Sequence, residues 1–514
     1  MAITFNNVPA TMRTPGTYVE IDSSRALTGL IENPHRVLIL GQKIAAGTAD
    51  VDALMAISRD SLADGFFGPG SILARMCNTF KNNNPNTELH AMALGSGIAG
   101  TAASCEIDIS GAVYSNAVSA NGTWYIMING EAVDVAITSG MSAESIATAL
   151  ITVINSNSNL PVTAAVDGAS AGVVAISAVN SGTMGNYINI RENYYDGQSI
   201  PLNFVSGSVG PLTIGSGGMA SRVFFSVMAG GATDPDLGDA WAVIDTQQFH
   251  YIIQPYIEAA NLTEIEDELT DRFLPLEDLQ GHGFTAVRAT LASCTTLGNS
   301  RNNPHNTIVG INDSPTGPEE WAAAWGAVAA WNLNIDPARP LHTLRLKGML
   351  PPPLENRFTR AERDILLYDG IATWIVSGGK PLIERSATTY QTNALGLLDP
   401  TYLDIQTLAT LSEIRFQYKQ RMTNRFISPR YKLADDSFPA QPGSKVVRAK
   451  DIRSESIALF TFLRDKGWIE NLDHFVDNLR VERDLVDRTR VNVLLPCDLI
   501  DQFRVLAAQI QFIL

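Results

Sequence analysis

The stretch Val37-Leu38-Ile39-Leu40-Gly41 is a continuous apolar run, which is typical of a strand buried on both faces of a parallel sheet. Helical periodicity follows over residues 51–61 and again over Ser71–Lys81, and Glu88–Leu94 has the pattern of a second strand. This order predicts a β–α–β unit, and therefore an α/β domain built around the first strand.

The alternation of strands and helices resumes near residue 220. The predicted strands are Phe249–Ile253, Gly283–Val287 and Thr307–Ile311, and the predicted helices are Asp236–Thr246, Leu262–Phe273 and Pro318–Trp331. Trp321, Trp325 and Val328 recur at helical spacing, which predicts a stripe that faces the core. We expect one α/β core domain made of residues 31–94 and 216–395.

Residues 95–215 interrupt this pattern, because Ser, Thr, Gly, Asn and Ala dominate and short alternating stretches recur. Trp124–Val135 predicts a hairpin with Asn129-Gly130 at its turn. Ser142–Asn155 predicts an amphipathic helix with its first residue as the N-cap. Two further strands are predicted, over Val162–Val166 and Val173–Val179. We expect this segment to form an inserted, β-rich outer domain.

The last third of the chain predicts an α+β domain over residues 396–498. Before it, helix Thr359–Tyr368 precedes a strand pair at Ile371–Val376 and Pro381–Tyr390. Within it, the predicted helices are Leu403 to about Asn424 and Ser456–Lys466, and the predicted strands are Asn478–Val486 and Thr489–Leu495. The complete fold class is therefore multidomain, with α/β and α+β parts.

Both chain ends have the character of extended arms, residues 1–30 and 499–514. Tyr18, Val19, Glu20 and Ile21 alternate as a short strand, which cannot persist without a sheet to join. The chain closes on Ile510, Phe512, Ile513 and Leu514, with no charge after Arg504. These side chains must be covered, either by their own domain or by another subunit. The pattern of Leu499–Ala508 fits a helix and an extended segment equally well.

The net charge of −16 is unevenly distributed: residues 1–330 carry −19 and residues 331–514 carry +3. An acidic chain disfavours direct binding of nucleic acid, because phosphate neutralisation requires a basic face. The longest apolar run is too short to span a membrane, and the N-terminus lacks the pattern of a signal peptide. The four cysteines are scattered, which predicts free thiols in a reducing cytoplasm and no zinc site.

Motifs that carry chemistry are weak in this sequence. Gly95-Ser-Gly97-Ile-Ala-Gly100 matches a dinucleotide fingerprint, but a strand rather than a helix is predicted after it. His282 has no nucleophile motif to pair with, so we expect a structural histidine. The carboxylates of one helix favour a solvated face over a metal site, and they are Glu264, Glu266, Asp267, Glu268 and Asp271. We expect no catalytic residue, no metal and no cofactor.

One dense basic cluster lies in the C-terminal domain, and its members are Arg415, Lys419, Arg421, Arg425, Arg430 and Lys432. Aromatic residues that could stack on bases are few in this stretch, which makes an acidic protein partner as good a candidate as nucleic acid.

Seven stretches, taken in order, resemble contractile-tail sheath proteins of the kind found in Mu-like phages. They are Thr14-Pro-Gly-Thr-Tyr-Val-Glu20, Asp336-Pro-Ala-Arg-Pro-Leu341-His-Thr-Leu, Arg357-Phe-Thr-Arg-Ala-Glu362, Asp369-Gly-Ile-Ala-Thr, Ile383-Glu-Arg-Ser-Ala-Thr-Thr-Tyr390, Phe462-Leu-Arg-Asp-Lys-Gly-Trp468 and Leu495-Pro-Cys-Asp-Leu-Ile-Asp-Gln-Phe-Arg-Val. The resemblance spans nearly the full length of the chain.

The resemblance implies a structural subunit with a subtilisin-like α/β core domain and no protease activity. It implies hexameric rings stacked helically around a tail tube, whose contraction drives the tube through the host envelope. The implied partners are further copies of the chain, the tail tube protein, and baseplate and tail terminator proteins. The implied location is the virion tail, after assembly in the host bacterial cytoplasm.

In related sheaths the two terminal arms add strands to a neighbouring subunit. The residues that match this role are Tyr18, Val19, Glu20 and Ile21 at one end, and Ile510, Phe512, Ile513 and Leu514 at the other. We expect Arg415, Lys419, Arg421 and Arg425 to face the tube. The alternative is an α/β hydrolase-like enzyme with an accessory binding domain, in which His282 would be essential.

Overall fold

The computed structural model describes residues 14, 16, 30–59, 61–95, 100–109, 121–168, 171–199, 224–439, 441 and 443–513. The chain divides into two compact units. The larger unit consists of Pro34–Ser412 and Asp501–Leu514, and the smaller one consists of Met1–Asn33 and Glu413–Ile500. The N-terminal strand predicted at Tyr18–Ile21 lies outside the described residues.

The larger unit is built on an eight-stranded sheet of order β15-β14-β13-β12-β11-β1-β3-β2. The strands are β1 Arg36–Gln42, β2 Leu54–Ala56, β3 Glu88–Leu94, β11 Tyr251–Ile253, β12 His282–Val287, β13 Asn306–Gly310, β14 Ile371–Ser377 and β15 Lys380–Arg385. The strands from β14 to β3 run parallel, and the two edge strands run antiparallel to their neighbours. Val37–Leu40 are fully buried, as predicted for a strand covered on both faces.

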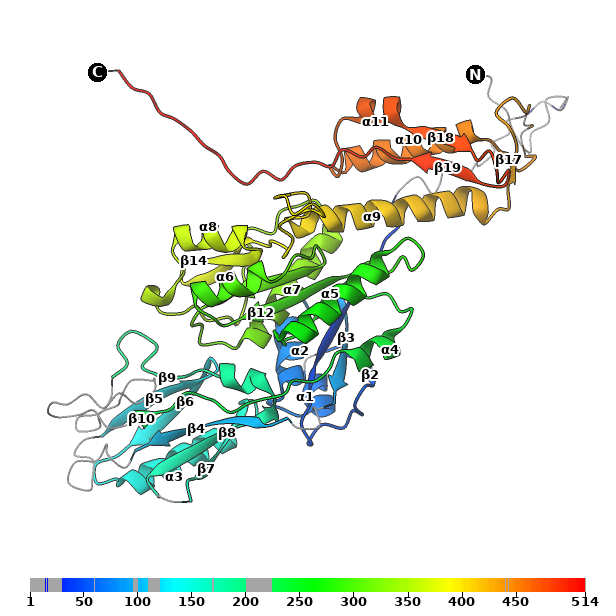
Figure 1. Cartoon of the computed structure of the whole chain (residues 1–514). Helices are drawn as coiled ribbons and strands as arrows, with labels where there is room; N and C mark the ends of the chain where they lie inside the picture. The colour runs from blue at the N-terminus through cyan, green and yellow to red at the C-terminus, as the bar shows by residue number, and fades with distance from the viewer. Residues whose placement is uncertain are drawn as a thin grey trace. The chain divides into compact units, whose positions relative to one another are not determined.

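Helices cover this sheet (Figure 1). They are α1 Leu62–Phe67, α2 Ile72–Asn83, α4 Gly238–Ile244, α5 Ala259–Phe273, α6 Leu291–Asn299, α7 Pro318–Ile335 and α8 Arg360–Tyr368. Helix α7 contacts α2, β11 and β12, and Trp321 and Trp325 are fully buried as predicted. Its backbone lies so close to β11 that a Cβ atom at Gly326 would be 2.5 Å from Ile253 Cδ1.

The helix predicted over residues 51–61 is wrong, because β2 occupies Leu54–Ala56 and α1 begins only at Leu62. Leu54 pairs with Met92 in an antiparallel ladder with β3. The chain reaches that edge through a turn in which Asp52 has a φ of 58°. The apolar residues of this short edge strand and its flanks recur at a spacing that also suits a helix, which explains the wrong prediction.

The inserted segment forms two small sheets with their own core. Its elements are β4 Ala102–Asp108, β5 Gly122–Ile128, β6 Glu131–Ile137, α3 Ala143–Ser156, β7 Val162–Val166, β8 Val173–Ser181, η2 Thr183–Tyr187 and β9 Ile190–Glu192. One further strand, β10 Phe224–Phe225, lies beyond the predicted limit at residue 215 and pairs with β4. The sheet orders are β10-β4-β8-β7 and β6-β5-β9. The predicted turn is confirmed, since Asn129 and Gly130 both have positive φ, and Ser142 Oγ caps α3 by accepting from the Ser145 N–H.

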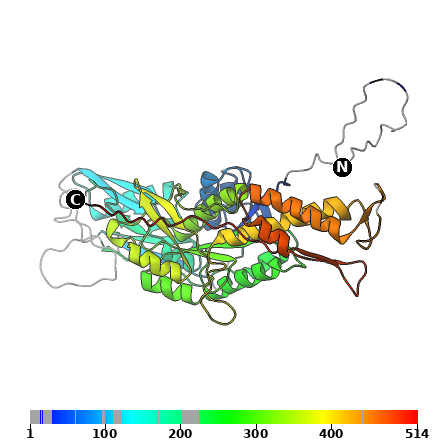
Figure 2. The ribbon, with the colours of Figure 1, turned by 90° about the horizontal axis from the view of Figure 1, so that it is seen from above.

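The smaller unit holds the end of α9 Ile405–Met422, and the unit boundary falls within this helix. Its other elements are a π-helical turn η4 Thr423–Ile427, β16 Lys432–Leu433, β17 Val446–Val447, α10 Ala449–Asp465, α11 Leu472–Asn478, β18 Arg480–Arg483 and β19 Val491–Leu494. Helices α9 and α10 run alongside each other (Figures 1 and 2), and Tyr418 Oη lies 3.3 Å from Ser456 Oγ. Helix α10 begins seven residues earlier than predicted, because Asp451 accepts from the backbone and side chain of Arg448.

The segment after Ile500 contains neither helix nor strand as far as residue 513, and Figure 2 shows it as an extended trace. The open question at Leu499–Ala508 is therefore answered against a helix. Leu499 makes one isolated bridge to Ile469, and the chain beyond it is extended.

Candidate functional site

The C-terminal arm exposes its apolar side chains. Ile510, Phe512 and Ile513 are 90%, 78% and 100% exposed, and Leu514 lies outside the described residues. A polypeptide end rarely holds several bare apolar side chains unless something else covers them. The arm thus has the properties of a segment that is buried only after assembly.

The hairpin of β18 and β19 offers unpaired strand edges. Its register runs from Arg480↔Leu494 to Arg483↔Val491, and no third strand joins it within the part of the chain that the structure describes. A two-stranded sheet is marginally stable, and its edges present unsatisfied N–H and C=O groups. Such a sheet gains stability when another strand is added.

The turn of this hairpin is held by carboxylates. Asp484 accepts from the Asp487 N–H at 2.9 Å, from Asn492 Nδ2 at 2.8 Å and from the Val486 N–H at 2.8 Å, and these hydrogen bonds lower the pKa of Asp484. Asp435 contacts Arg483 and Arg488 at 2.8 and 3.0 Å. The hairpin is therefore held in place by contacts within the single subunit.

The four predicted tube-facing residues differ in their surroundings. Arg421 pairs with Glu455 on α10, and Arg425 lies 3.8 Å from the same carboxylate. Lys419 and Arg425 are exposed, whereas Arg415 and Arg421 are half-buried. Among these four residues, the exposed positive charge therefore comes from Lys419 on α9 and Arg425 in the following turn η4.

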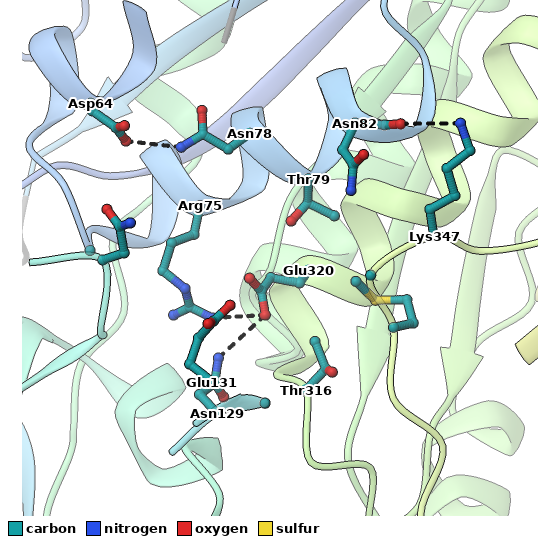
Figure 3. Close-up of a pocket in the computed structure, with 15 residues that line it drawn as sticks. Asp64, Arg75, Asn78, Thr79, Asn82, Asn129, Glu131, Thr316, Glu320 and Lys347 are labelled. Atoms are coloured by element: carbon teal, nitrogen blue, oxygen red, sulfur yellow. Dashed lines mark hydrogen bonds and ion pairs between the residues drawn. The ribbon is translucent and has the colours of Figure 1, made fainter. Parts of the chain in front are cut away.

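A buried ion cluster joins the inserted segment to the core (Figure 3). Arg75 of α2 donates to Glu319 Oε1 at 2.7 Å and lies 3.0 Å from Glu320 Oε2, both at the start of α7. Asn129, in the β5–β6 turn, donates to the same two oxygens at 3.3 and 3.4 Å. The positive end of the helix dipole also favours the two carboxylates. The side chains of Arg75 and Glu319 are 9% and 6% exposed.

A polar cavity of about 250 Å³ opens beside this cluster. Its wall includes Asp64, Asn78, Glu131, Thr316 and Lys347, and Asp64 and Asn78 point toward each other in Figure 3. Burial raises the pKa of Glu320 to about 7, although the charge of Arg75 opposes this shift. One guanidinium serves two carboxylates, so the cluster carries a net negative charge when both are ionised.

Apart from Asn129, which is predicted only at a turn, no residue of this cluster is predicted from the sequence, although a signal is present. Arg75 is the one charged residue in the first nine positions of α2, and Glu319-Glu320 open a helix that is otherwise uncharged. A charge in a buried stripe needs a partner. The partners lie 244 and 245 positions apart from Arg75 in the chain, so only the fold identifies them.

The cluster predicts a pH dependence that can be isolated with Glu320→Gln. A folded-state pKa of about 7 exceeds the usual carboxyl value, so the folded chain binds an extra proton between about pH 4.5 and 7. We expect the contribution of Glu320 to stability to fall as pH rises through this window, by at most about 1.4 kcal/mol per pH unit. Melting curves at pH 5.5 and 8 should differ less for the variant.

A parallel variant for this experiment is Glu192→Gln, in the inserted segment, which should flatten the pH slope in the same way. Glu192 accepts from Trp124 Nε1 at 3.2 Å, and burial raises its pKa to about 7. Buried His35 and His305 have lowered pKa values and oppose the carboxyl slope below about pH 6.5. The two histidines titrate alike in wild type and variant, so their effect cancels when the pH slopes of the two proteins are subtracted. Equal pH slopes for wild type and Glu320→Gln would show that Glu320 titrates normally.

The predicted structural role of His282 agrees with its position inside the sheet. His282 Nε2 lies 2.8 Å from Thr307 Oγ1, and burial lowers its pKa well below the usual value. The strand predicted after Gly95–Gly100 is confirmed as β4, so no helix N-terminus follows that motif. Within the described residues, no group of side chains could hold a metal ion. No helix in that part of the chain is long and apolar enough to cross a membrane.

The prediction of a solvated acidic face on α5 is wrong for one residue. Glu266 is buried, accepts from Asn306 Nδ2 at 3.2 Å and lies 3.4 Å from Arg301 Nη1. The remaining carboxylates line a shallow surface hollow with Trp241, and they are Glu264, Asp267, Glu268 and Asp271. Glu266 therefore joins α5 to the sheet and does not belong to the solvated face.

The fold defines the class of the molecule, which is a mixed α/β protein of more than one compact unit. Comparisons with known proteins identify its family. The central-domain model of the phage tail sheath protein matches residues 230–389, and the C-terminal-domain model matches residues 398–513. The chain is 36% identical over 515 residues to the Mu-like prophage FluMu tail sheath protein of Haemophilus influenzae, and the match covers 100% of both chains.

Two solved structures are also similar. The sheath tail protein of Desulfitobacterium hafniense gives a TM-score of 0.46 at 13% identity, over 94% of this chain and 100% of that one. The contracted helical sheath of the anti-feeding prophage gives 0.48 at 9% identity, over 98% and 99%. From the sequence matches, the chain belongs to the phage tail sheath protein family.

The predicted function is thereby confirmed at the level of the family. The protein is a structural subunit of a contractile tail sheath, a virion component and not an enzyme. Membership of this family implies a helical homopolymer. The hydrolase alternative is excluded.

Proposed function

We propose that the subunits assemble as hexameric rings, stacked helically around a tail tube, and that contraction drives this tube through the host envelope. The proposed partners beyond further copies are the tube protein and the baseplate and terminator proteins. Assembly takes place in the host cytoplasm. No nucleotide site is required, because an assembled lattice can be trapped in a high-energy arrangement and released by a trigger.

The observation that carries this proposal is the combination of a bare apolar arm with an open two-stranded sheet. Ile510, Phe512 and Ile513 need cover, and the edges of β18 and β19 need a strand. A subunit that donates at one patch and receives at another makes a heterologous contact, which builds rings or open helices. Strand addition supplies main-chain hydrogen bonds and pockets for alternate side chains. We assign the N-terminal Tyr18–Ile21 the same role.

The domain limits belong to the same proposal. The core domain comprises residues 31–94 and 216–395 and has a subtilisin-like arrangement. The outer domain is 95–215, the C-terminal domain is 396–498, and the arms are 1–30 and 499–514. The largely parallel sheet with covering helices supports the α/β assignment of the core.

The direct test is a negative-stain image of the purified full-length protein. We expect hollow, striated cylinders whose length increases with protein concentration. Particles that stay monomeric at every concentration and ionic strength, or closed compact particles without a lumen, would contradict the proposal.

Charge reversal on α9 and the adjoining turn η4 tests the tube-facing assignment. Lys419 and Arg425 are exposed, so Lys419→Glu with Arg425→Glu should weaken co-assembly with an acidic tube surface by about tenfold or more at low salt. The measurement is pelleting of the sheath with purified tube. The matched control is Arg345→Glu with Lys380→Glu, which changes the net charge equally at exposed positions of the larger unit. Unchanged co-pelleting of the α9 variant would remove these residues from the tube interface.

A further inference from the structure

Arg504 is one of the few residues of the C-terminal arm that are not exposed. The flanking Phe503, Val505 and Leu506 are 73%, 82% and 80% exposed, whereas the Arg504 side chain is 18% exposed. Its Nη2 lies 3.0 Å from Asp404 Oδ1 and 3.4 Å from Gln406 Oε1. A charged side chain therefore ties the arm to its own subunit at residue 504.

The acceptor of this contact is itself rigidly held. Arg385, the last residue of β15, binds both oxygens of Asp404 at 2.9 Å. Asp404 also forms an isolated bridge with Ala387 and directly precedes α9. A bidentate arginine–carboxylate pair has fixed geometry, so Asp404 presents its carboxylate to Arg504 in one orientation.

The contact lies at the edge of a groove along α8. The groove has a volume of about 620 Å³, and Arg504 and Val505 line it together with Arg360, Asp364 and Leu367. The described residues after Val505, as far as Ile513, are all exposed.

The other chain end shows the same type of attachment within the smaller unit. Gln417 of α9 accepts from the Ile31 N–H at 3.0 Å and donates to the Ile31 carbonyl at 2.6 Å. Asn33 donates to Glu413 at 2.8 Å. Side chains on or next to α9 therefore hold the chain where each arm begins.

We propose that Arg504 is a positioning residue that anchors the root of the C-terminal arm to its own subunit, so that only the segment after it reaches a neighbour. This inference rests on the proposed donation of the arm. The nine described residues from Val505 to Ile513 span at most about 30 Å when extended, which sets the distance to the receiving sheet. An anchored arm searches a smaller volume than a free one, which raises its effective concentration at a receptor within reach.

The test compares full-length variants. Arg504→Ala should assemble about tenfold more slowly, measured by light scattering at equal protein concentration, with an unchanged melting curve of the monomer. Arg504→Lys should lie between wild type and alanine. The matched control Arg360→Ala removes an exposed arginine from the same groove and should assemble like wild type.

A length test separates positioning from a general structural role. Deletion of Leu506–Ala508 shortens the reach by about 10 Å and should abolish assembly. Arg504→Ala in that background should restore part of it, because the arm can then start from Ile500. Any of three results would overturn the anchor: normal assembly of Arg504→Ala, normal assembly of the deletion, or no restoration of assembly in the double variant. A chain ending at Gln509 that assembles normally would instead overturn the donated arm itself.

Discussion

A chain that ends at Gln509 is expected to fold normally and to remain a monomer. The five residues removed include Ile510, Phe512 and Ile513, which are bare in the single subunit, so the truncated monomer loses no core. In the lattice each such side chain is worth roughly 1.5–3 kcal/mol when buried. The donated strand also loses its main-chain hydrogen bonds. Because every subunit makes the same contact, this binding free energy is lost each time a subunit is added to the lattice.

Sedimentation velocity and negative stain measure this effect, and circular dichroism checks the fold. Two full-length controls keep the length of the arm. Ile510→Ser with Phe512→Ser changes one face of a strand, and Gln511→Ser with Ile513→Ser changes the other. The pair that packs in the receiving sheet should prevent assembly, whereas the opposite pair should only weaken it. Cylinders formed by the truncated chain would show that Gln509–Leu514 is not the donated strand.

Much of the larger unit could be predicted because its elements are set by local pattern. Val37–Leu40 must be buried on both faces, and the positive φ values at Asn129-Gly130 suit a tight hairpin turn. The error at residues 51–61 has a tertiary origin. A three-residue strand gains its stability from pairing with β3, about 35 positions further along, and not from its own sequence.

The site residues likewise fall into those that the sequence reveals and those that only the fold reveals. The bare apolar terminus is visible in the sequence, because no charge follows Arg504. The partner of Arg504 cannot be read from the sequence, since Asp404 lies 100 positions earlier and is held in place by its pairing with Arg385. Glu266 shows the same limit: its helix neighbours are solvated, and only the packing of β13 against α5 buries it with Asn306. Pairings across the fold decide these roles.

Replacement of Arg75 by Ala is expected to destabilise the larger unit by about 3–5 kcal/mol, because it leaves Glu319 and Glu320 buried without a cation. The loss should be greatest where both carboxylates are ionised, above about pH 7, since the pKa of Glu320 is already raised to about 7. The start of α7 and the Asn129 turn share this cluster, so the inserted segment should also become more accessible to protease.

The matched control separates the ion pair from the packing of the site. Arg75→Met with Glu319→Gln and Glu320→Gln removes the charges together, and neutral replacement of a buried cluster often costs little stability. We therefore expect the triple variant to melt several degrees above Arg75→Ala. A melting temperature of Arg75→Ala equal to that of wild type would mean that water reaches both carboxylates. The cluster would then be a polar contact and not the buried joint that holds the inserted segment to the core.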